Sequence, residues 1–310
     1  LHPANTLSLH DALPIYAAKA MWIFYENPEF TFEEAAKPFN LPELRQKAKF
    51  IAISTTSGTG TEVTSFSVIT DNETGVKYPI ADYNITPDIA IVDTNLVQSM
   101  TKTLVANTGM DALTHAFEAY VSNAKNPITD AVAMKSIEMT VANLFESFEE
   151  EESQARKDMH ISQCLAGMAF SNAILGIVHS MSHKTGKIFN IPHGCANAIY
   201  LSSVIQFNAK TASAAADYAD ISKRLGLKGE TTTELVQSLI QLVKDFRVSM
   251  NMPTTLKEFG VSEEYFKSNL DEISRTAVSD ACTGTNPREI SVEEMKKLFE
   301  ATYYGTEVNF

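Results

Sequence analysis

Short apolar runs separated by polar or glycine-rich breaks occupy the first third of the chain. They predict a helix over Ala17–Tyr25 and strands over Lys49–Ser54, Ser67–Thr70, Lys77–Ile80 and Asp88–Asp93. The turn-forming residues Asp71–Gly75 predict that the second and third of these strands form a hairpin. The last strand, DIAIVD, carries an unbroken apolar run that is typical of a buried strand. This part of the chain is therefore expected to be α/β.

The pattern changes after Asp93, because strand-like runs nearly vanish and helical periodicity dominates from Leu104 to Tyr304. The expected helices are Met110–Val121, Ile128–Phe148, Gln154–Phe170, Ile174–Lys184, Ala212–Leu225, Thr231–Arg247 and Val292–Tyr303. Pro127 precedes the second of them, where its missing N–H costs nothing. We expect a domain boundary near residue 94, with an α/β segment over 16–93 and an all-α segment over 94–310.

Length and composition limit the classes of protein that fit. A chain of 310 residues can hold two domains, and a net charge of −13 argues against nucleic acid and anionic membranes as partners. No apolar run is long enough to span a bilayer. The cysteines Cys164, Cys195 and Cys282 are too few and too far apart for a disulfide framework, so we expect a cytoplasmic protein.

The segment TLSLHDALPI, from Thr6 to Ile15, matches the in-frame translation of a common sequencing-library adapter. We interpret residues 1–15 as a non-native segment and exclude them from the fold. His2 and His10 then take no part in any metal site.

Six residues suggest a metal site: Asp111, His115, Glu118, His179, His183 and His193. Asp111 and His115 lie four apart, as do His179 and His183, so each pair shares one face of a helix. His193 follows in a Pro-His-Gly turn. One carboxylate and several imidazoles suit iron, zinc or manganese. Each pair alone could be structural, but four of the five histidines beyond residue 15 fall in these motifs.

The remaining candidates carry weaker signals. His160 is expected to lie on a polar helix face with no special role, and Cys195 is a less favoured soft ligand. The loop Thr55–Glu62, TTSGTGTE, offers hydroxyls and backbone N–H groups after a strand, where α/β sheets bind ligands. It is neither a Rossmann fingerprint nor a P-loop, so a plain turn remains an alternative. The residues alone do not settle which histidine is not a ligand.

Together these motifs resemble the iron-containing (group III) alcohol dehydrogenases, in particular the alcohol dehydrogenase domain of bifunctional aldehyde–alcohol dehydrogenases and the butanol and 1,3-propanediol dehydrogenases. The segments that carry the resemblance are TTSGTGTEVTSFSVITD, KYPIADYNITPDIAIVD, GMDALTHAFEAYVS, GIVHSMSHKTGKIFNIPHGCANA, DACTGTNPR and TYYG. The resemblance implies a dehydroquinate synthase-like fold, with a partial dinucleotide-binding α/β domain over 16–93 and a helical metal-binding domain over 94–310.

The resemblance also implies a role for each matching residue. The implied metal ligands are Asp111, His115, His179 and His193. His183 is implied to be a proton relay near the substrate, and Glu118, which has no liganding counterpart, becomes structural. The implied dinucleotide-binding residues are Thr55, Thr56, Thr59, Val68, Lys77 and Leu96. The implied cofactors are Fe²⁺, with Zn²⁺ as the alternative, and NAD or NADP.

The implied activity is interconversion of a primary alcohol and an aldehyde by hydride transfer, in a homo-oligomeric parent enzyme. One departure weakens this expectation, because the residues LPIY stand where the family has a Gly-Gly-Gly-Ser pyrophosphate loop, and the strands before it are missing. Two alternatives therefore stay open: an inactive truncated metal-binding fragment, and a metal-dependent hydrolase.

Overall fold

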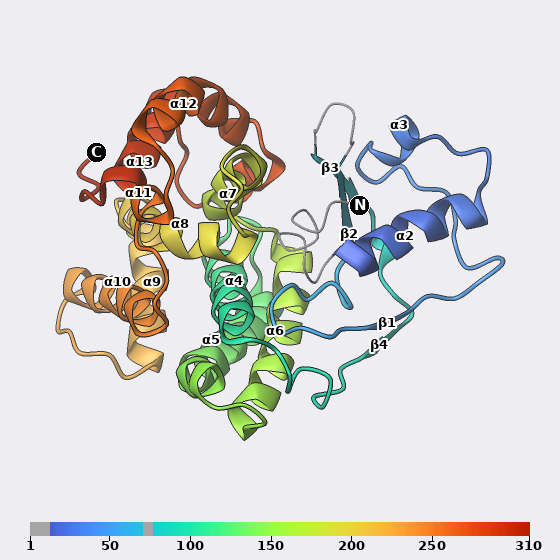
Figure 1. Cartoon of the computed structure of the whole chain (residues 1–310), viewed down its shortest axis with the longest axis horizontal. Coiled ribbons are helices and arrows are strands. Elements are labelled where there is room, and N and C mark those ends of the chain that lie inside the picture. The colour runs from blue at the N-terminus through green and yellow to red at the C-terminus, as the bar shows by residue number, and fades with distance from the viewer. Residues whose placement is uncertain (1–12, 71–76) are drawn as a thin grey trace.

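The computed structural model describes residues 13–70 and 77–310, and these form two parts with separate hydrophobic cores (Figure 1). The smaller part contains α2 (Leu13–Glu26), α3 (Phe32–Ala35), β1 (Ile51–Ile53), β2 (Phe66–Thr70), β3 (Lys77–Ala81), η1 (Tyr83–Ile85) and β4 (Ile89–Ile91). Its core gathers around Trp22, Ile23 and Ile80. The predicted first helix is confirmed, although it begins at Leu13, inside the segment we interpreted as non-native.

The four strands form two separate pairs. β2 and β3 run antiparallel with Phe66 opposite Ala81, as the hairpin prediction requires, and the predicted turn Asp71–Gly75 lies outside the described residues. β1 and β4 pair in parallel, with Ile51 opposite Ile89. The α/β class expected for this part is therefore right.

The expectation that the DIAIVD strand is buried is wrong. Ile89 and Ile91 of β4 are 50% and 41% exposed, and their neighbours Ile51 and Ile53 on β1 are exposed too. A sheet face becomes buried only when a second layer packs on it. Within residues 13–70 and 77–310, β1 and β4 pair only with each other, and their isoleucine side chains remain at the surface.

The larger part is helical. Its elements are α4 (Lys102–Val121), α5 (Pro127–Glu149), α6 (Gln154–Ala173), α7 (Ile177–Ile188), α8 (His193–Asn208), α9 (Ala212–Arg224), α10 (Thr232–Ser249), α11 (Leu256–Phe259), α12 (Glu263–Val278), η2 (Ala281–Thr285) and α13 (Val292–Tyr304). Pro127 occupies the first turn of α5 behind the Asn126 cap, as predicted. α4 begins eight residues before the predicted Met110, because Thr101 caps it by accepting a hydrogen bond from the Leu104 N–H.

Helix α4 positions the candidate site. It packs against α5, α6 and α8, and nearly all of its residues from Val105 to Val121 are buried. Figure 1 shows α4 in the middle of the helical part, and its side chains from Val105 onward are buried on nearly every face. In the described part of the chain no single helix is long and apolar enough to cross a membrane; only α6 and α7 together pass that test, and they are bent by 105°.

Candidate active site

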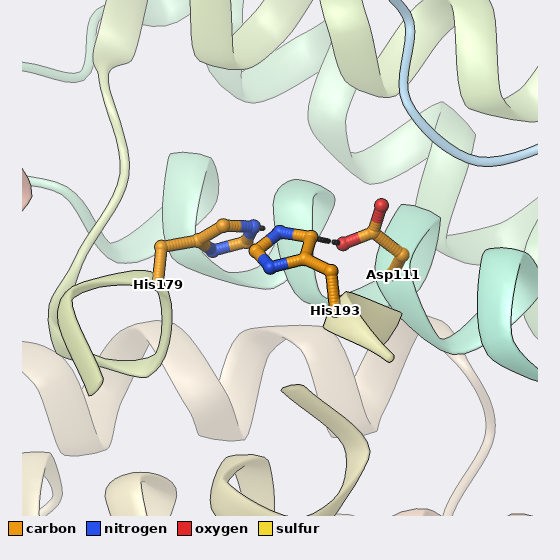
Figure 2. Close-up of side chains that lie close together, drawn as sticks. All are labelled: Asp111, His179 and His193. Carbon is orange, nitrogen blue, oxygen red and sulfur yellow. Dashed lines mark ion pairs between the residues drawn. The ribbon is translucent and has the colours of Figure 1, made fainter. Parts of the chain in front are cut away.

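The structure brings the first predicted helical pair together with His179 of the second pair and with His193. Asp111 and His115 lie one turn apart on α4, with His115 Nε2 3.8 Å from Asp111 Oδ1. His179 comes from α7 and His193 from the first residue of α8, and the Nε2 atom of each lies 3.6 Å from the same Asp111 oxygen. Figure 2 shows the two imidazoles pointing toward the Asp111 carboxylate. These separations are too long for hydrogen bonds, yet short enough for one cation to contact both partners.

The imidazoles of His179 and His115 are each held by a hydrogen-bond partner at Nδ1, the nitrogen that faces away from Asp111. Glu118 Oε2 lies 2.5 Å from His179 Nδ1, while Glu118 Oε1 accepts the Val178 N–H at 2.7 Å. A carboxylate only accepts, so the proton in this contact belongs to His179 Nδ1, and Nε2 is the nitrogen directed at Asp111. His115 Nδ1 lies 3.3 Å from the Gly58 carbonyl oxygen, which places a proton on Nδ1 of that ring as well. In both residues Nε2 thus faces Asp111, so Nε2 is the nitrogen that would bind a metal in place of a proton.

Glu118 is the residue that sequence reasoning undervalued. It sits seven residues after Asp111 and is buried, so it lies on the same side of α4 as the ligand pair. That spacing was the available signal. A structural role was expected for Glu118. Its contact with His179 shows what that role is, because Glu118 orients the ring of a candidate metal ligand.

Asn197 was not singled out from the sequence, although it lies one turn after His193 on α8. Its Nδ2 atom lies 2.6 Å from Asp111 Oδ1, 3.2 Å from His179 Nε2 and 3.3 Å from His193 Nε2. Ser182 donates a hydrogen bond to the Asn197 side-chain oxygen, which sets the direction of the amide. One polar atom therefore contacts three candidate ligand atoms, so those atoms converge on a common point.

The electrostatics of this cluster favour a cation. Burial acts to raise the pKa of Asp111, but the imidazoles of His115, His193 and His179 hold it well below its usual value, so the carboxylate is ionised. Burial lowers the pKa of His115 to about 4 despite the nearby Asp111. Burial also acts to lower the pKa of His179, but Glu118 and Asp111 outweigh it and raise the value to about 9. Two buried carboxylates thus face imidazoles, and a divalent ion would balance their charge.

The donor set fits a metal of the iron or zinc type. One carboxylate oxygen and two imidazole nitrogens, from Asp111, His179 and His193, lie within 4.8 Å of one another. His115 is close by, and its ring stacks on the ring of His179 at 4.6 Å. Cys195 is instead buried in the apolar core, where burial raises the pKa of its thiol to about 12. Cys195 therefore does not belong to the group of candidate ligands.

His183 lies beside the cluster without joining it. Its ring is nearly parallel to that of His193, with the centroids 5.8 Å apart, and its Nδ1 atom lies 3.2 Å from Asp280 Oδ2. The His183 side chain is 25% exposed, whereas that of His179 is 1% exposed. His183 and His193, whose side chain is 34% exposed, are therefore both partly open to solvent, while His179 is buried.

The Thr/Ser/Gly loop over residues 55–62 runs against α4 and α6. One face of α6 holds it: Gln163 Oε1 accepts the Gly60 N–H at 2.6 Å, and His160 contacts the hydroxyls of Ser54 and Ser57 at 3.3 Å. His160 was expected on a polar helix face; its neighbours are indeed polar, but that face is buried under this loop. The reason is tertiary: the polar groups that it faces belong to the loop, not to water.

The residues expected to bind a dinucleotide are spread over this loop and the nearby strands. Thr55 is exposed and Thr56 is buried, while Thr59 Oγ1 lies 3.4 Å from Thr61 Oγ1. Val68 is half-buried on β2, and Leu96 is 42% exposed in the turn after β4. The side chain of Lys77 lies outside the described part of the chain, although its backbone pairs with Thr70. Loop and cluster touch directly through the contact of His115 with Gly58.

Comparison with known proteins identifies the family. A sequence profile of iron-containing alcohol dehydrogenases matches residues 13–94, and the profile of the C-terminal region of the Fe-containing alcohol dehydrogenase family matches residues 105–303. The chain belongs to the iron-containing alcohol dehydrogenase family. The resemblance inferred from the motifs is thereby confirmed, and so is the dehydroquinate synthase-like fold.

Individual members of the family align with almost the whole chain. The NADPH-dependent butanol dehydrogenase of Clostridium saccharobutylicum is 61% identical over 308 residues, which cover 99% of this chain and 79% of that enzyme. The bifunctional aldehyde-alcohol dehydrogenase AdhE of Escherichia coli (strain K12) is 42% identical over 98% of this chain, which spans only 37% of AdhE. The solved iron-containing alcohol dehydrogenase of Thermococcus thioreducens superposes with a TM-score of 0.87 at 37% identity, over 95% of this chain and 76% of that one.

Proposed function

We propose that this chain carries the catalytic site of an NAD(P)-dependent alcohol dehydrogenase that interconverts a primary alcohol and an aldehyde. The observation that carries the proposal is the direct contact between the two halves of the site: the Asp111, His179 and His193 cluster lies one hydrogen bond, from His115 to Gly58, from the Thr/Ser/Gly loop. A metal and a nucleotide bound at these places would meet across that contact. Butanol is the substrate to test first, because a relative is an NADPH-dependent butanol dehydrogenase.

In this proposal, different residues bind the metal ion and the dinucleotide. Asp111, His115, His179 and His193 would hold the ion, which when bound supplies Lewis-acid polarisation of the substrate oxygen. Thr55, Thr56, Thr59, Val68, Lys77 and Leu96 would hold the dinucleotide, whose nicotinamide supplies the hydride chemistry. Glu118 keeps Nε2 of His179 directed into the site, and Asn197 keeps Asp111 in place.

His183 would move the hydroxyl proton. Its ring lies beside that of His193 and is partly open to solvent, so a proton accepted at Nε2 has a route outward. In alcohol oxidation the hydride goes to the nicotinamide and the proton goes to His183 and then to water. In aldehyde reduction the same residue returns the proton to the substrate oxygen.

The setting and assembly of the enzyme are part of the same proposal. Cys164, Cys195 and Cys282 are all free thiols, which suits a reducing cytoplasmic compartment. We place the enzyme there, as a homo-oligomer that takes small alcohols and aldehydes.

Transfer of a labelled hydride tests the reaction class. The Fe²⁺-loaded chain, mixed anaerobically with butanal and NADPH or NADH deuterated at the transferred position, should yield butanol with one deuterium on its first carbon. Asp111→Asn should abolish the product while leaving nucleotide binding, measured by fluorescence, within about twofold. Ester cleavage without nucleotide, with no deuterated butanol formed, would point to hydrolase chemistry instead. Metal binding with neither product would favour a metal-binding fragment.

A further inference from the structure

Asp280 gathers an unusual number of hydrogen-bond donors at the edge of the active site. It precedes η2 and faces α7, and its side chain is 10% exposed. His183 Nδ1 lies 3.2 Å and Lys184 Nζ 2.7 Å from its Oδ2 atom. The backbone N–H of Cys282 donates to its Oδ1 atom at 3.1 Å. Both carboxylate oxygens are therefore occupied by donors.

The state of this carboxyl group follows from its neighbours. Burial acts to raise the pKa of Asp280, but His183 and the Lys184 ammonium outweigh burial and hold the pKa well below its usual value. An ionised carboxylate only accepts hydrogen bonds, so the proton in the contact with His183 belongs to Nδ1. The lone pair of that imidazole is then on Nε2.

The same arrangement occurs within the candidate metal site. Glu118 accepts from Nδ1 of His179, just as Asp280 accepts from Nδ1 of His183 one turn further along α7. The two acids reach α7 from different elements, α4 and η2. Each holds one histidine of the His179/His183 pair with a proton on Nδ1.

We propose that Asp280 is a positioning residue for the proton-transfer step, which holds His183 in the tautomer with a basic Nε2 atom. This inference rests on the proposed dehydrogenase function, because it is that reaction which releases a proton. Nε2 takes the alcohol hydroxyl proton as hydride leaves the same substrate for the nicotinamide. The imidazolium that forms is stabilised by the adjacent carboxylate, and it returns the proton to water.

A second metal site is the competing explanation for this cluster, because His183, Asp280 and Cys282 offer one ligand atom each within 4.8 Å. The contacts argue against it. Lys184 places an ammonium 2.7 Å from the carboxylate oxygen that an ion would use. Burial and Asp280 raise the pKa of the Cys282 thiol well above its usual value, so it does not offer a thiolate.

Replacement of Asp280 by Asn distinguishes a role in positioning His183 from a purely structural role as the cap of η2. Asn caps helical turns as well as Asp does, so Asp280→Asn keeps the acceptor for the Cys282 N–H. Its amide nitrogen then faces His183 and donates where the carboxylate accepted. A residue with only a capping role would show no change in His183. Asp271→Asn is the matched control, because that side chain is 85% exposed and bonds only to Lys296 in the described part of the chain.

The experiment measures tautomer and turnover on the full chain. Nitrogen-15 histidine NMR of the Zn²⁺-loaded protein should place the His183 proton on Nδ1, and Asp280→Asn should move it to Nε2. In the Fe²⁺-loaded enzyme kcat for butanol oxidation should fall by about 10² or more in Asp280→Asn. KM for nucleotide, metal content and Tm should match those of Asp271→Asn. Asp280→Glu should recover part of kcat together with the Nδ1 tautomer.

Two results would overturn the proposal: an unchanged His183 tautomer in Asp280→Asn, or a changed tautomer with kcat within about threefold of the control. Failure of the proposed function is distinguishable from both. If the unsubstituted chain transfers no hydride, the dehydrogenase proposal falls, and the NMR comparison alone decides whether Asp280 sets the tautomer.

Discussion

Glu118 on α4 and His179 on α7 are joined by a 2.5 Å contact, although 61 residues separate them in the sequence. The contact decides which imidazole nitrogen faces Asp111, and it connects the two helices that supply the candidate ligands. It is buried, so water does not compete for it.

Loss of the Glu118 charge should weaken metal binding without unfolding the protein. Glu118→Gln keeps the size of the side chain, but its amide cannot accept from both His179 Nδ1 and the Val178 N–H. Removing such a supporting partner typically costs about 10- to 100-fold in metal affinity. We expect a loss of that size for Fe²⁺ or Zn²⁺ in chelator competition. Glu138→Gln, at a surface position of α5, is the control and should change nothing. Equal metal affinities of Glu118→Gln and the unsubstituted chain would mean that Glu118 contributes packing but does not support metal binding.

Gly60 should tolerate no side chain. Its φ is +59°, and a Cβ atom there would lie 2.6 Å from the Gly167 Cα atom on α6. Gly226 has a similar φ of +69°, but nothing lies within 4 Å of its Cβ position. Gly226→Ala should therefore cost only the left-handed strain of about 1–2 kcal/mol in free energy of unfolding. Gly60→Ala adds a backbone clash, so it should cost more and displace the loop over residues 55–62.

Urea unfolding and NADH fluorescence titration measure these two effects. The expected order is a larger loss of stability for Gly60→Ala, with weaker nucleotide binding in that variant alone. Indistinguishable stabilities for the two glycine variants would show that α6 yields to the loop, and the close packing would then be unimportant.

His160 should support nucleotide binding from beneath the loop. His160→Phe keeps a buried ring but leaves the hydroxyls of Ser54 and Ser57 without their partner. Each buried polar group left unpaired costs about 1–3 kcal/mol. We expect lower stability and weaker NADH or NADPH binding, with metal affinity unchanged. Ser57→Ala combined with His160→Phe should cost less than the sum of the two single changes, because one contact is shared. Strict additivity would count against this contact.

The sequence predicted what depends on local periodicity. Spacing of four residues places Asp111 with His115, and His179 with His183, on one face of a helix, whatever the rest of the fold does. The contacts of Glu118 with His179 and of Asp280 with His183 join residues far apart in the chain, so no local pattern encodes them. His160 shows the same limit, because its polar partners come from a loop about a hundred residues away.

In the fold, too, the features set by local periodicity were predicted, and those set by distant contacts were not. The expected helices with one apolar and one polar face were found, whereas α8 could be predicted only as a packed helix that starts at HGCANA, without an end. Nearly every residue of α8 is buried, so apolar side chains surround it and no helical period stands out. α12 was missed, although Ser262 followed by Glu263 and Glu264 is a helix-start signal. Strand β4 was expected to be buried from its composition alone, but burial depends on which layers cover it.

Lys19 should give the stability of the fold a measurable pH dependence. Its side chain is fully buried, with Nζ donating to the backbone oxygens of Thr64 at 2.5 Å and Phe66 at 3.1 Å. Burial lowers the pKa of Lys19 to about 7 despite the nearby Glu62. Between that value and the ordinary pKa of 10.5, the unfolded chain binds a proton that the folded chain does not. This residue therefore destabilises the fold fully below pH 7, and the destabilisation is relieved as pH rises.

Lys19→Met removes this proton-linked difference. The free energy of unfolding of the unsubstituted chain, minus that of Lys19→Met, should rise from about pH 7 to about pH 9, by at most about 1.4 kcal/mol per pH unit. Urea titrations at several pH values measure it, and other titrating groups cancel because both proteins contain them. Lys102→Met, which removes an exposed lysine paired with Glu149, is the control for the loss of one lysine side chain. A flat difference for Lys19→Met would show that Lys19 stays protonated inside the fold, held by its two carbonyl acceptors and Glu62.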